Sequence, residues 1–130
     1  SIDVCRKALE QGFYPDIIAS DWTDDKYNLS NTGKSLTFVM AKYLELGMPL
    51  MEVIRCVTET PAKCMKMEGQ IGTLKPGAYA DVAVFRMVDR KAVHRDCNHV
   101  AFETGRLLIP QLVFVDGEPA FCQADFGLFD

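Results

Sequence analysis

The two histidines of the chain are the first residues to test for metal chemistry. His94 and His99 lie five positions apart, the first inside and the second directly after a polar stretch, residues 90–98, that shows no clear period. A helical metal site places its histidines at i and i+4, so this spacing does not fit. We interpret both side chains as part of a solvated loop or strand edge rather than of a hydrolytic zinc site.

Five cysteines could in principle serve in metal binding, redox chemistry or nucleophilic catalysis. They are scattered, and no pair has the short separation of a zinc knuckle or a redox motif. A catalytic thiolate also needs a basic partner, and neither histidine is placed recognisably to supply one. The pattern favours reduced, mostly buried thiols in a cytosolic protein. The cysteines are Cys5, Cys56, Cys64, Cys97 and Cys122.

Among the carboxylates, Asp21 stands directly after a short apolar run, residues 16–20. The carboxyl ends of strands host catalysis in barrels. Taken alone, however, an Asp at such a position is more often a turn residue. The pair Asp24-Asp25 is interpreted in the same way, as solvated turn residues. Whether Asp21 is interpreted as a catalytic residue therefore depends on the elements predicted around it.

The first half of the chain predicts alternating helix and strand. Apolar residues at helical spacing predict a helix near residues 2–9 that ends at Gly12. The run at residues 16–20 is suited to a buried strand, and a polar loop, residues 21–34, follows it. Three further helices are predicted over residues 36–44, 49–57 and 60–67, the last with Thr60 as its cap and Pro61 in its first turn.

The second half of the chain changes to a strand pattern. Pro110 interrupts one apolar stretch, which indicates an edge or a bulge. Asp116-Gly117 is a two-residue hairpin signal, and Gly77 provides the positive φ of a turn. Asp81 is expected to bond to nearby turn backbone. The predicted strands are residues 80–85, 107–109, 111–115 and 118–122.

Length and composition set the outer limits. With 130 residues, 48% of them apolar, the chain can build a core and is not a disordered tail or linker. A formal net charge of −4 argues against nucleic-acid binding. No stretch approaches the roughly 20 apolar residues that span a bilayer, and the first residues lack a signal-peptide pattern. We therefore expect a cytoplasmic protein.

The predicted strand at residues 16–20 has no partner in this pattern. Helices flank it, so it belongs to a parallel α/β layer, yet the first half offers no second such strand. The later strands are joined by hairpins and cannot easily supply one. The chain also begins at Ser1, and its first methionine is Met40. We expect it to be the end of a larger fold.

Several motifs resemble those of the amidohydrolase superfamily. Two of them are similar to its last barrel strand and the helices that follow, and a third is similar to its T-x-N-P-A turn, from which Glu59 and Thr60 depart. The fourth resembles its re-entry into a small β-domain. The dihydroorotase-like and deacetylase-like branch, with its D-aminoacylase relatives, is the most similar. The segments are residues 12–21 (GFYPDIIASD), 39–48 (VMAKYLELGM), 58–63 (TETPAK) and 69–85 (GQIGTLKPGAYADVAVF).

This resemblance implies the last strand and helices of an incomplete (β/α)8 TIM barrel, followed by part of a small β-sandwich. Residues 1–67 would form the end of the barrel, with its last strand near residues 16–20. Residues 68–130 would form a segment of the composite β-sandwich. Of the family's metal-ligand positions, only the Asp after the eighth strand maps onto this chain, at Asp21.

The resemblance therefore implies that Asp21 is a metal ligand and a catalytic residue in the complete enzyme. There it would accept a proton from water whose pKa a zinc ion lowers to about 7, and return it to the leaving nitrogen. Zinc or another divalent metal is expected in the complete enzyme. None is expected on this chain alone, because a catalytic zinc needs three protein ligands. Trp22 and Tyr27 are candidates to contact the substrate, although each could equally be a packing residue.

Two functions stay open at this point. The first is a fragment of a metal-dependent amidohydrolase, which when complete hydrolyses a C–N bond of a small amide or cyclic amide, and which is inactive as the isolated chain. The second is a non-enzymatic binding or assembly module that keeps the remnant of the fold. Unpaired strand edges and apolar faces predict a homo-oligomer. Neither nucleic acid nor a membrane is expected as a partner.

Overall fold

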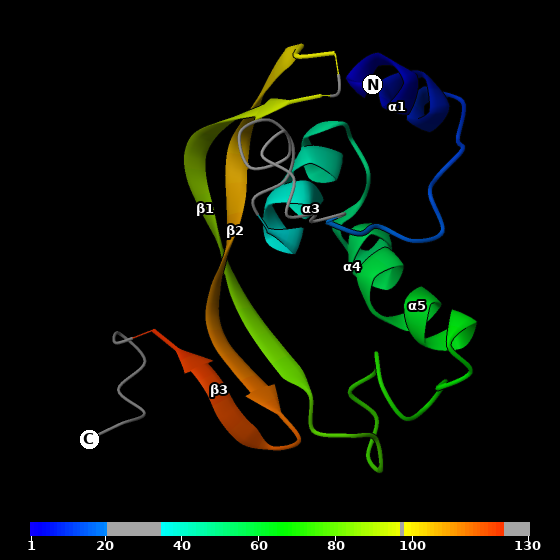
Figure 1. The fold of residues 1–130 in the computed structure, drawn as a ribbon, viewed down its shortest axis with the longest axis vertical. Helices are drawn as coiled ribbons and strands as arrows, with labels where there is room; N and C mark the ends of the chain where they lie inside the picture. Colours follow the sequence, from blue (N-terminus) through cyan, green and yellow to red (C-terminus); the bar gives the residue numbers. More distant parts are fainter. Residues whose placement is uncertain (21–34, 97, 124–130) are drawn as a thin grey trace.

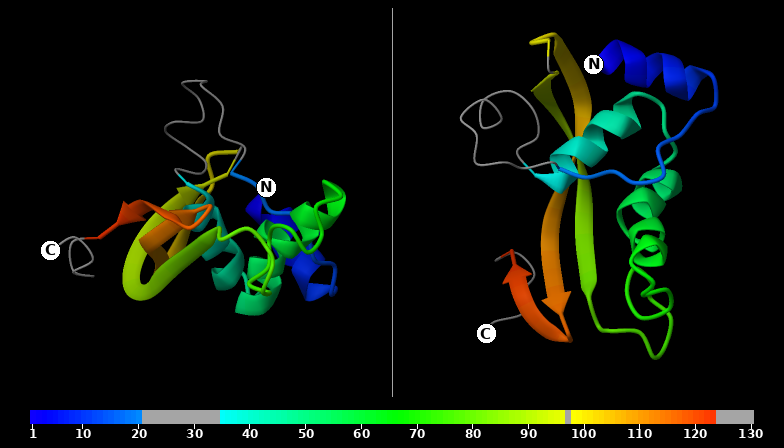
Figure 2. Two further views of the ribbon diagram at one scale, coloured as in Figure 1. Left: turned by 90° about the horizontal axis from the view of Figure 1, so that it is seen from below. Right: turned by 45° about the vertical axis from the view of Figure 1, so that its right-hand side comes forward.

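The computed structural model of the chain describes residues 1–20, 35–96 and 98–123. In these ranges the helices precede the strands in the chain, and both views in Figure 2 place the helices on one side of a long β-hairpin. The elements are α1 (Ile2–Glu10), α3 (Leu36–Glu45), α4 (Leu50–Val57), α5 (Glu59–Cys64), β1 (Val82–Arg95), β2 (Ala101–Val115) and β3 (Glu118–Cys122). In Figure 1, α1 lies near the end of the hairpin where β1 meets β2, and β3 lies toward the opposite end of the molecule.

One small apolar core joins the helices to the hairpin. Its centre is Val53 on α4, which has no exposed surface. Leu108 brings β2 into the same cluster, and Ile18 brings in the segment that follows α1. This core therefore brings parts of the chain that are distant in sequence into contact. The buried members are Ile18, Val39, Met40, Met48, Val53, Cys56 and Leu108.

The three strands form one antiparallel sheet in the order β1-β2-β3. The predicted hairpin at Asp116-Gly117 is confirmed, since these residues have φ angles of 52° and 82°, as a two-residue hairpin turn of this kind requires. Asp81 does bond to turn backbone, but to the β2–β3 turn rather than to one near it in sequence, because its Oδ1 accepts the Asp116 N–H at 2.8 Å. Within residues 1–20, 35–96 and 98–123 this is the only sheet, so the second layer of a β-sandwich stays a prediction.

Pro110 lies inside a continuous β2, where the sequence predicted two strands. The pairing shifts register there, because Val84 pairs with Leu112 while Phe85 pairs with Pro110. Gln111 is thereby the extra residue of a bulge. A bulge accommodates a residue that cannot donate to the ladder, which confirms the interpretation of Pro110.

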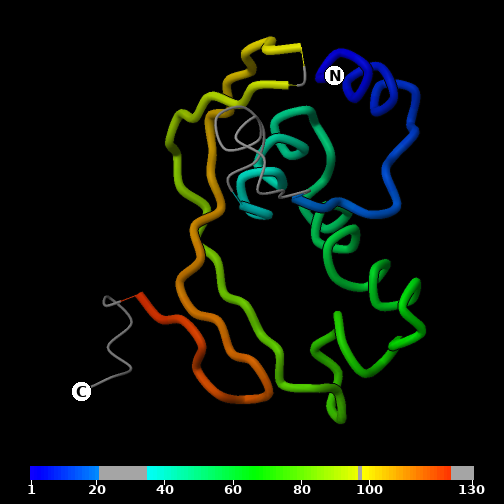
Figure 3. Tube along the Cα trace, in the orientation of Figure 1, coloured from blue at the N-terminus to red at the C-terminus, as the bar shows by residue number. Residues whose placement is uncertain are grey.

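The strand predicted at residues 16–20 is not formed. These residues have no regular secondary structure, and Figure 3 traces them as an irregular path from α1 toward α3 and α4. A strand needs a neighbouring backbone to complete its hydrogen bonds, and the described part of the chain places no strand beside this segment. Its one described backbone bond runs from the Ile18 N–H to the Cys56 carbonyl, at 3.0 Å.

The observed helices match the predictions from the sequence more closely than the observed strands do. Those predicted at residues 2–9, 36–44 and 49–57 are confirmed as α1, α3 and α4, with small shifts at their ends. By contrast, α5 begins at Glu59 rather than after a Thr60 cap, and it ends at Cys64. Pro61 then lies in its first turn, where a missing N–H breaks no helical bond.

His94 lies on β1, which extends well past its predicted end, and its side chain is buried. The interpretation of this residue as solvated is therefore wrong. Its imidazole stacks on Phe38 of α3 with the ring centroids 3.8 Å apart, and its Nε2 lies 3.3 Å from the Thr104 hydroxyl oxygen on β2. Burial, and then the nearby Lys42 ammonium, lower the pKa of His94 from 6.5 to about 4. A neutral imidazole thus packs the hairpin onto α3.

Gly72 and Gly77 provide a matched test of how the segment after α5 is packed. Both have positive φ, but a Cβ on Gly72 would lie 2.5 Å from the Thr58 carbonyl oxygen, whereas one on Gly77 would meet nothing within 4 Å. We expect Gly77→Ala to cost about 1 kcal/mol, from the positive φ alone. Gly72→Ala should cost about 3 kcal/mol, because overpacking adds to that strain. Urea unfolding measures both, and equal costs would contradict the close approach to Thr58.

The second prediction concerns the acid stability of the His94 contact. The unfolded chain binds a proton on this imidazole from about pH 6.5 downward, but the folded chain does so only near pH 4. The stabilisation that the neutral imidazole provides is therefore fully present above about pH 6.5 and is lost as the pH falls toward 4. Over this range the unfolding constant should rise by up to about tenfold per pH unit. His94→Leu should remove this slope.

His99→Asn serves as the control for the acid-stability experiment. His99 lies in the β1–β2 loop with a φ of 60°, a conformation that Asn tolerates well. This variant should keep the wild-type slope between pH 6.5 and 4. Urea unfolding at several pH values measures all three proteins, and a His94→Leu slope equal to the wild-type one would overturn the assignment.

Candidate functional site

The residues that lead to the predicted catalytic position are attached to α4 through one residue, Cys56. Its Sγ–H donates to the Pro15 carbonyl at 3.0 Å. Its own carbonyl accepts the Ile18 N–H, also at 3.0 Å. The Ile18 side chain is buried in the core, so both backbone and side chain hold this segment. Ser20 is the last described residue before Asp21.

The three predicted site residues, Asp21, Trp22 and Tyr27, lie outside the described residues. Their roles stay predictions. On the far side of residues 21–34, Ser35 caps α3, where its Oγ accepts the Phe38 N–H at 3.2 Å. Because α3 contributes Val39 and Met40 to the core that also contains Ile18, the segments on both sides of residues 21–34 are attached to the same core.

The described residues do not form a metal centre by themselves. Nowhere in residues 1–20, 35–96 and 98–123 do three His, Cys, Asp or Glu side chains gather as a metal ion would require. His94 is stacked on Phe38 and lies beside Thr104. His99 belongs to the loop that joins β1 to β2. A metal site that includes Asp21 would need ligands other than these.

Asp96 is a buried carboxylate that the sequence analysis did not single out. Its Oδ2 accepts the Ile2 N–H at 3.0 Å, and its Oδ1 accepts the N–H groups of Asn98 and Val100 at 2.9 and 3.0 Å. These bonds, with that of Ile2 the largest cause, hold the pKa of Asp96 below its usual value. Asp96 thus joins the hairpin loop to the start of α1. An Asp opening a short polar turn is a local signal for such bonds.

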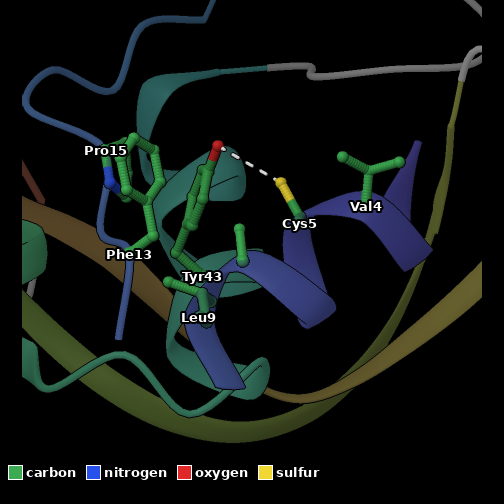
Figure 4. A pocket seen from close by; sticks show the side chains of 7 residues that line it. Val4, Cys5, Leu9, Phe13, Pro15 and Tyr43 are labelled. Atoms are coloured by element: carbon green, nitrogen blue, oxygen red, sulfur yellow. Dashed lines mark hydrogen bonds between the residues drawn. The ribbon is translucent and has the colours of Figure 1, made fainter. Parts of the chain in front are cut away.

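A pocket with a volume of about 160 Å³ lies between α1 and α3 (Figure 4). Its polar groups are the Cys5 thiol and the Tyr43 hydroxyl, with Sγ and Oη 3.8 Å apart. Burial, and then the Cys5 thiol, raise the pKa of Tyr43 to about 12, so the phenol stays protonated. The pocket therefore offers an apolar surface without a general base. It is lined by Val4, Cys5, Ala8, Leu9, Phe13, Pro15 and Tyr43.

The four described cysteines are free thiols, as the sequence predicts. Their burial differs from the prediction, because only Cys56 is fully buried and Cys64, at the end of α5, is exposed. Cys5 and Cys122 are half-buried.

No helix in the described part of the chain is long and apolar enough to cross a membrane.

Comparison with known sequences gives matches over most of the chain. A model of the amidohydrolase family matches residues 1–120. A deacetylase of Brucella anthropi is 30% identical over 118 residues, which are 91% of this chain and 29% of that protein. A deacetylase of Agrobacterium fabrum is 28% identical over 118 residues, 91% of this chain and 28% of that protein. The chain thus spans less than a third of the length of these curated relatives.

Comparison with solved structures gives the same grouping. The chain is similar to a dihydroorotase, with a TM-score of 0.81, 26% identity, and coverage of 95% of this chain and 32% of the other. It also shares its fold with an adenine deaminase, with a TM-score of 0.86, 23% identity, and coverage of 95% of this chain and 33% of the other. The resemblance seen in the sequence is confirmed: the chain belongs to the amidohydrolase family.

Proposed function

We propose that this chain is part of a metal-dependent amidohydrolase that hydrolyses a C–N bond in a small amide or cyclic amide. The observation that carries this proposal is the family match over residues 1–120, together with relatives named as deacetylases and a structural relative named as a dihydroorotase. Because the chain spans only 29% of the Brucella anthropi relative, the activity would belong to a longer protein that contains this chain, and the isolated chain would be inactive.

Asp21 is the residue that we propose as metal ligand and catalytic carboxylate. It follows Ser20 directly, at the end of the segment that Cys56 and the core hold in place. A carboxylate at this position can accept a proton from the attacking water and return it to the leaving nitrogen. Trp22 and Tyr27 are proposed to contact the substrate from the same loop.

The metal in this proposal is zinc or another divalent ion. A zinc site in an enzyme uses three protein ligands, and the described residues hold no such group. We therefore propose that ligands outside this chain's described residues complete the site, and that the chain alone binds no catalytic metal.

We also propose two features of the intact protein. Residues 1–67 would complete a barrel, and residues 68–130 would form one part of a β-sandwich whose other strands come from elsewhere. A cytoplasmic location is supported by the free thiols, because reduced cysteines persist in that compartment.

A chimeric enzyme tests the catalytic role of Asp21. The matched 118-residue stretch of the Brucella anthropi deacetylase is replaced by this chain, and hydrolysis of N-acylated and cyclic amides is measured. Asp21→Asn should lower kcat by about 100-fold or more, the usual contribution of a general acid–base group. Elemental analysis should find zinc or another divalent metal in the chimera and no stoichiometric metal in the isolated chain.

Asp89→Asn is the matched control for this experiment, because it removes one exposed carboxylate on β1. It should leave kcat unchanged. If the Asp21→Asn chimera kept full activity, the proposed role of Asp21 would fail. Tightly bound metal retained by the isolated chain after dialysis would overturn the proposal that the chain alone binds no catalytic metal.

The second candidate function, a binding or assembly module, is supported by the exposed apolar side chains. Val4 and Phe13 beside the α1–α3 pocket are 67% and 72% exposed. Such side chains gain free energy when another surface covers them. We therefore propose that the isolated chain forms a homo-oligomer through this face.

Light scattering of the purified chain measures this association. The expected mass is that of at least two chains at moderate concentration. Replacing both Val4 and Phe13 by Ser should shift the mass toward that of one chain, because it removes the apolar surface that the contact buries. Leu74→Ser, which removes a side chain that is 80% exposed elsewhere, is the control and should leave the mass unchanged. A monomeric wild-type chain would count against the assembly.

A further inference from the structure

We propose that Cys56 is a positioning residue, which holds residues 15–18 in place and through them sets where the chain enters position 21. This inference rests on the proposed function of Asp21 for its catalytic meaning. The geometry that carries it is a pair of hydrogen bonds between one residue of α4 and the segment that precedes Asp21.

The two bonds of Cys56 hold the segment at two points. The thiol donates to the Pro15 carbonyl, and the Cys56 carbonyl accepts from the Ile18 N–H, both at 3.0 Å. The thiol contact is close for a sulfur donor. By comparison, the Sγ of Cys5 lies 3.8 Å from the Tyr43 hydroxyl. With its two ends bonded to one helical residue, the segment has little freedom to shift along α4.

The surroundings of Cys56 keep its thiol able to donate. Only 4% of the residue is exposed, and burial raises the pKa of the thiol, with the Glu52 carboxylate acting in the same direction. At neutral pH the sulfur therefore carries its proton. A thiolate could not donate to the Pro15 carbonyl, so protonation is a condition for this contact.

The segment itself offers little other support. Ile18 is buried, but its neighbours Ile17 and Ala19 are exposed, and the only described backbone bond of residues 16–20 is the one to Cys56. Among the described residues, the Ile18 side chain and the two Cys56 bonds fix this segment against α4 and the core.

Two substitutions separate the hydrogen bond from the packing of Cys56. Cys56→Ser keeps a donor of similar shape, whereas Cys56→Val keeps an apolar side chain and loses the donor. If the thiol bond positions the segment, Val should raise the amide exchange rate of Ile18 by about fivefold to tenfold, the effect of losing one hydrogen bond. Ser should stay close to wild type. The amide of Val53, whose bond to the Pro49 carbonyl lies within the same helix, reports on α4 itself.

The NMR signal of the Asp21 carboxyl carbon gives a readout that packing alone would not move. Its chemical shift should change in Cys56→Val and return toward the wild-type value in Cys56→Ser. Cys122→Ala is the control, because that thiol donates to the neighbouring Gln123 carbonyl at the other end of the molecule, and it should change neither signal.

A third measurement does not depend on the stability of the Cys56→Val variant. The infrared S–H stretch that disappears in Cys56→Ser should lie at the lower frequency of a hydrogen-bonded thiol. The proposal is overturned if that band has the frequency of a free thiol, if Val leaves Ile18 exchange unchanged, or if Val rather than Ser preserves the wild-type behaviour.

These readouts are independent of catalysis, so the two proposals can fail separately. If Asp21→Asn leaves the chimera active while Ile18 exchange responds to Cys56 as expected, the function of Asp21 is wrong and the positioning contact stands. If Asp21→Asn abolishes activity while the amide exchange rate of Ile18 is unchanged by the Cys56 substitutions, the positioning proposal alone is wrong.

Discussion

The side chain of Val53 has no contact with solvent, and the small cluster around it connects every layer of the molecule. Ile18 enters it from the segment after α1, Met40 from α3 and Leu108 from β2. Burial of apolar surface is the main favourable term in folding, and here few residues provide it. The position of the hairpin relative to the helices, and of the segment that leads to Asp21, therefore depends on this one cluster.

Buried polar residues complete the attachment of the hairpin. Thr104 has no exposed surface, and His94, Asp96 and Gln111 are nearly as buried. Such groups are costly without partners, and in the described residues each buried side-chain nitrogen and oxygen has one. His94 links the hairpin to α3 through Phe38, and Asp96 links its loop to α1. Apolar packing brings these layers together, and the polar contacts give the hairpin a specific register against them.

The candidate site shows why strand and site predictions differ in quality from helix predictions. A helix bonds to itself, so apolar spacing, Gly12 and the turn at Gly47 are enough to place α1 and α3 closely. A strand bonds to a partner, and residues 16–20 have the apolar pattern of a strand but no strand beside them among the residues that the structure describes. Asp21 could be proposed from its place in the motif, whereas the contacts of Cys56 that hold the preceding residues could not.

By itself the amino-acid sequence determined the family, the helices, the Asp116-Gly117 hairpin and the position at which a catalytic carboxylate is expected. Each of these is encoded by a local motif or a short period. Only the tertiary structure decided that His94 is buried against Phe38, that β1 continues through a polar stretch, and that Cys56 bonds to both Pro15 and Ile18. The physical reason is that burial and hydrogen-bond partners come from residues far away in the chain, so no local pattern contains them.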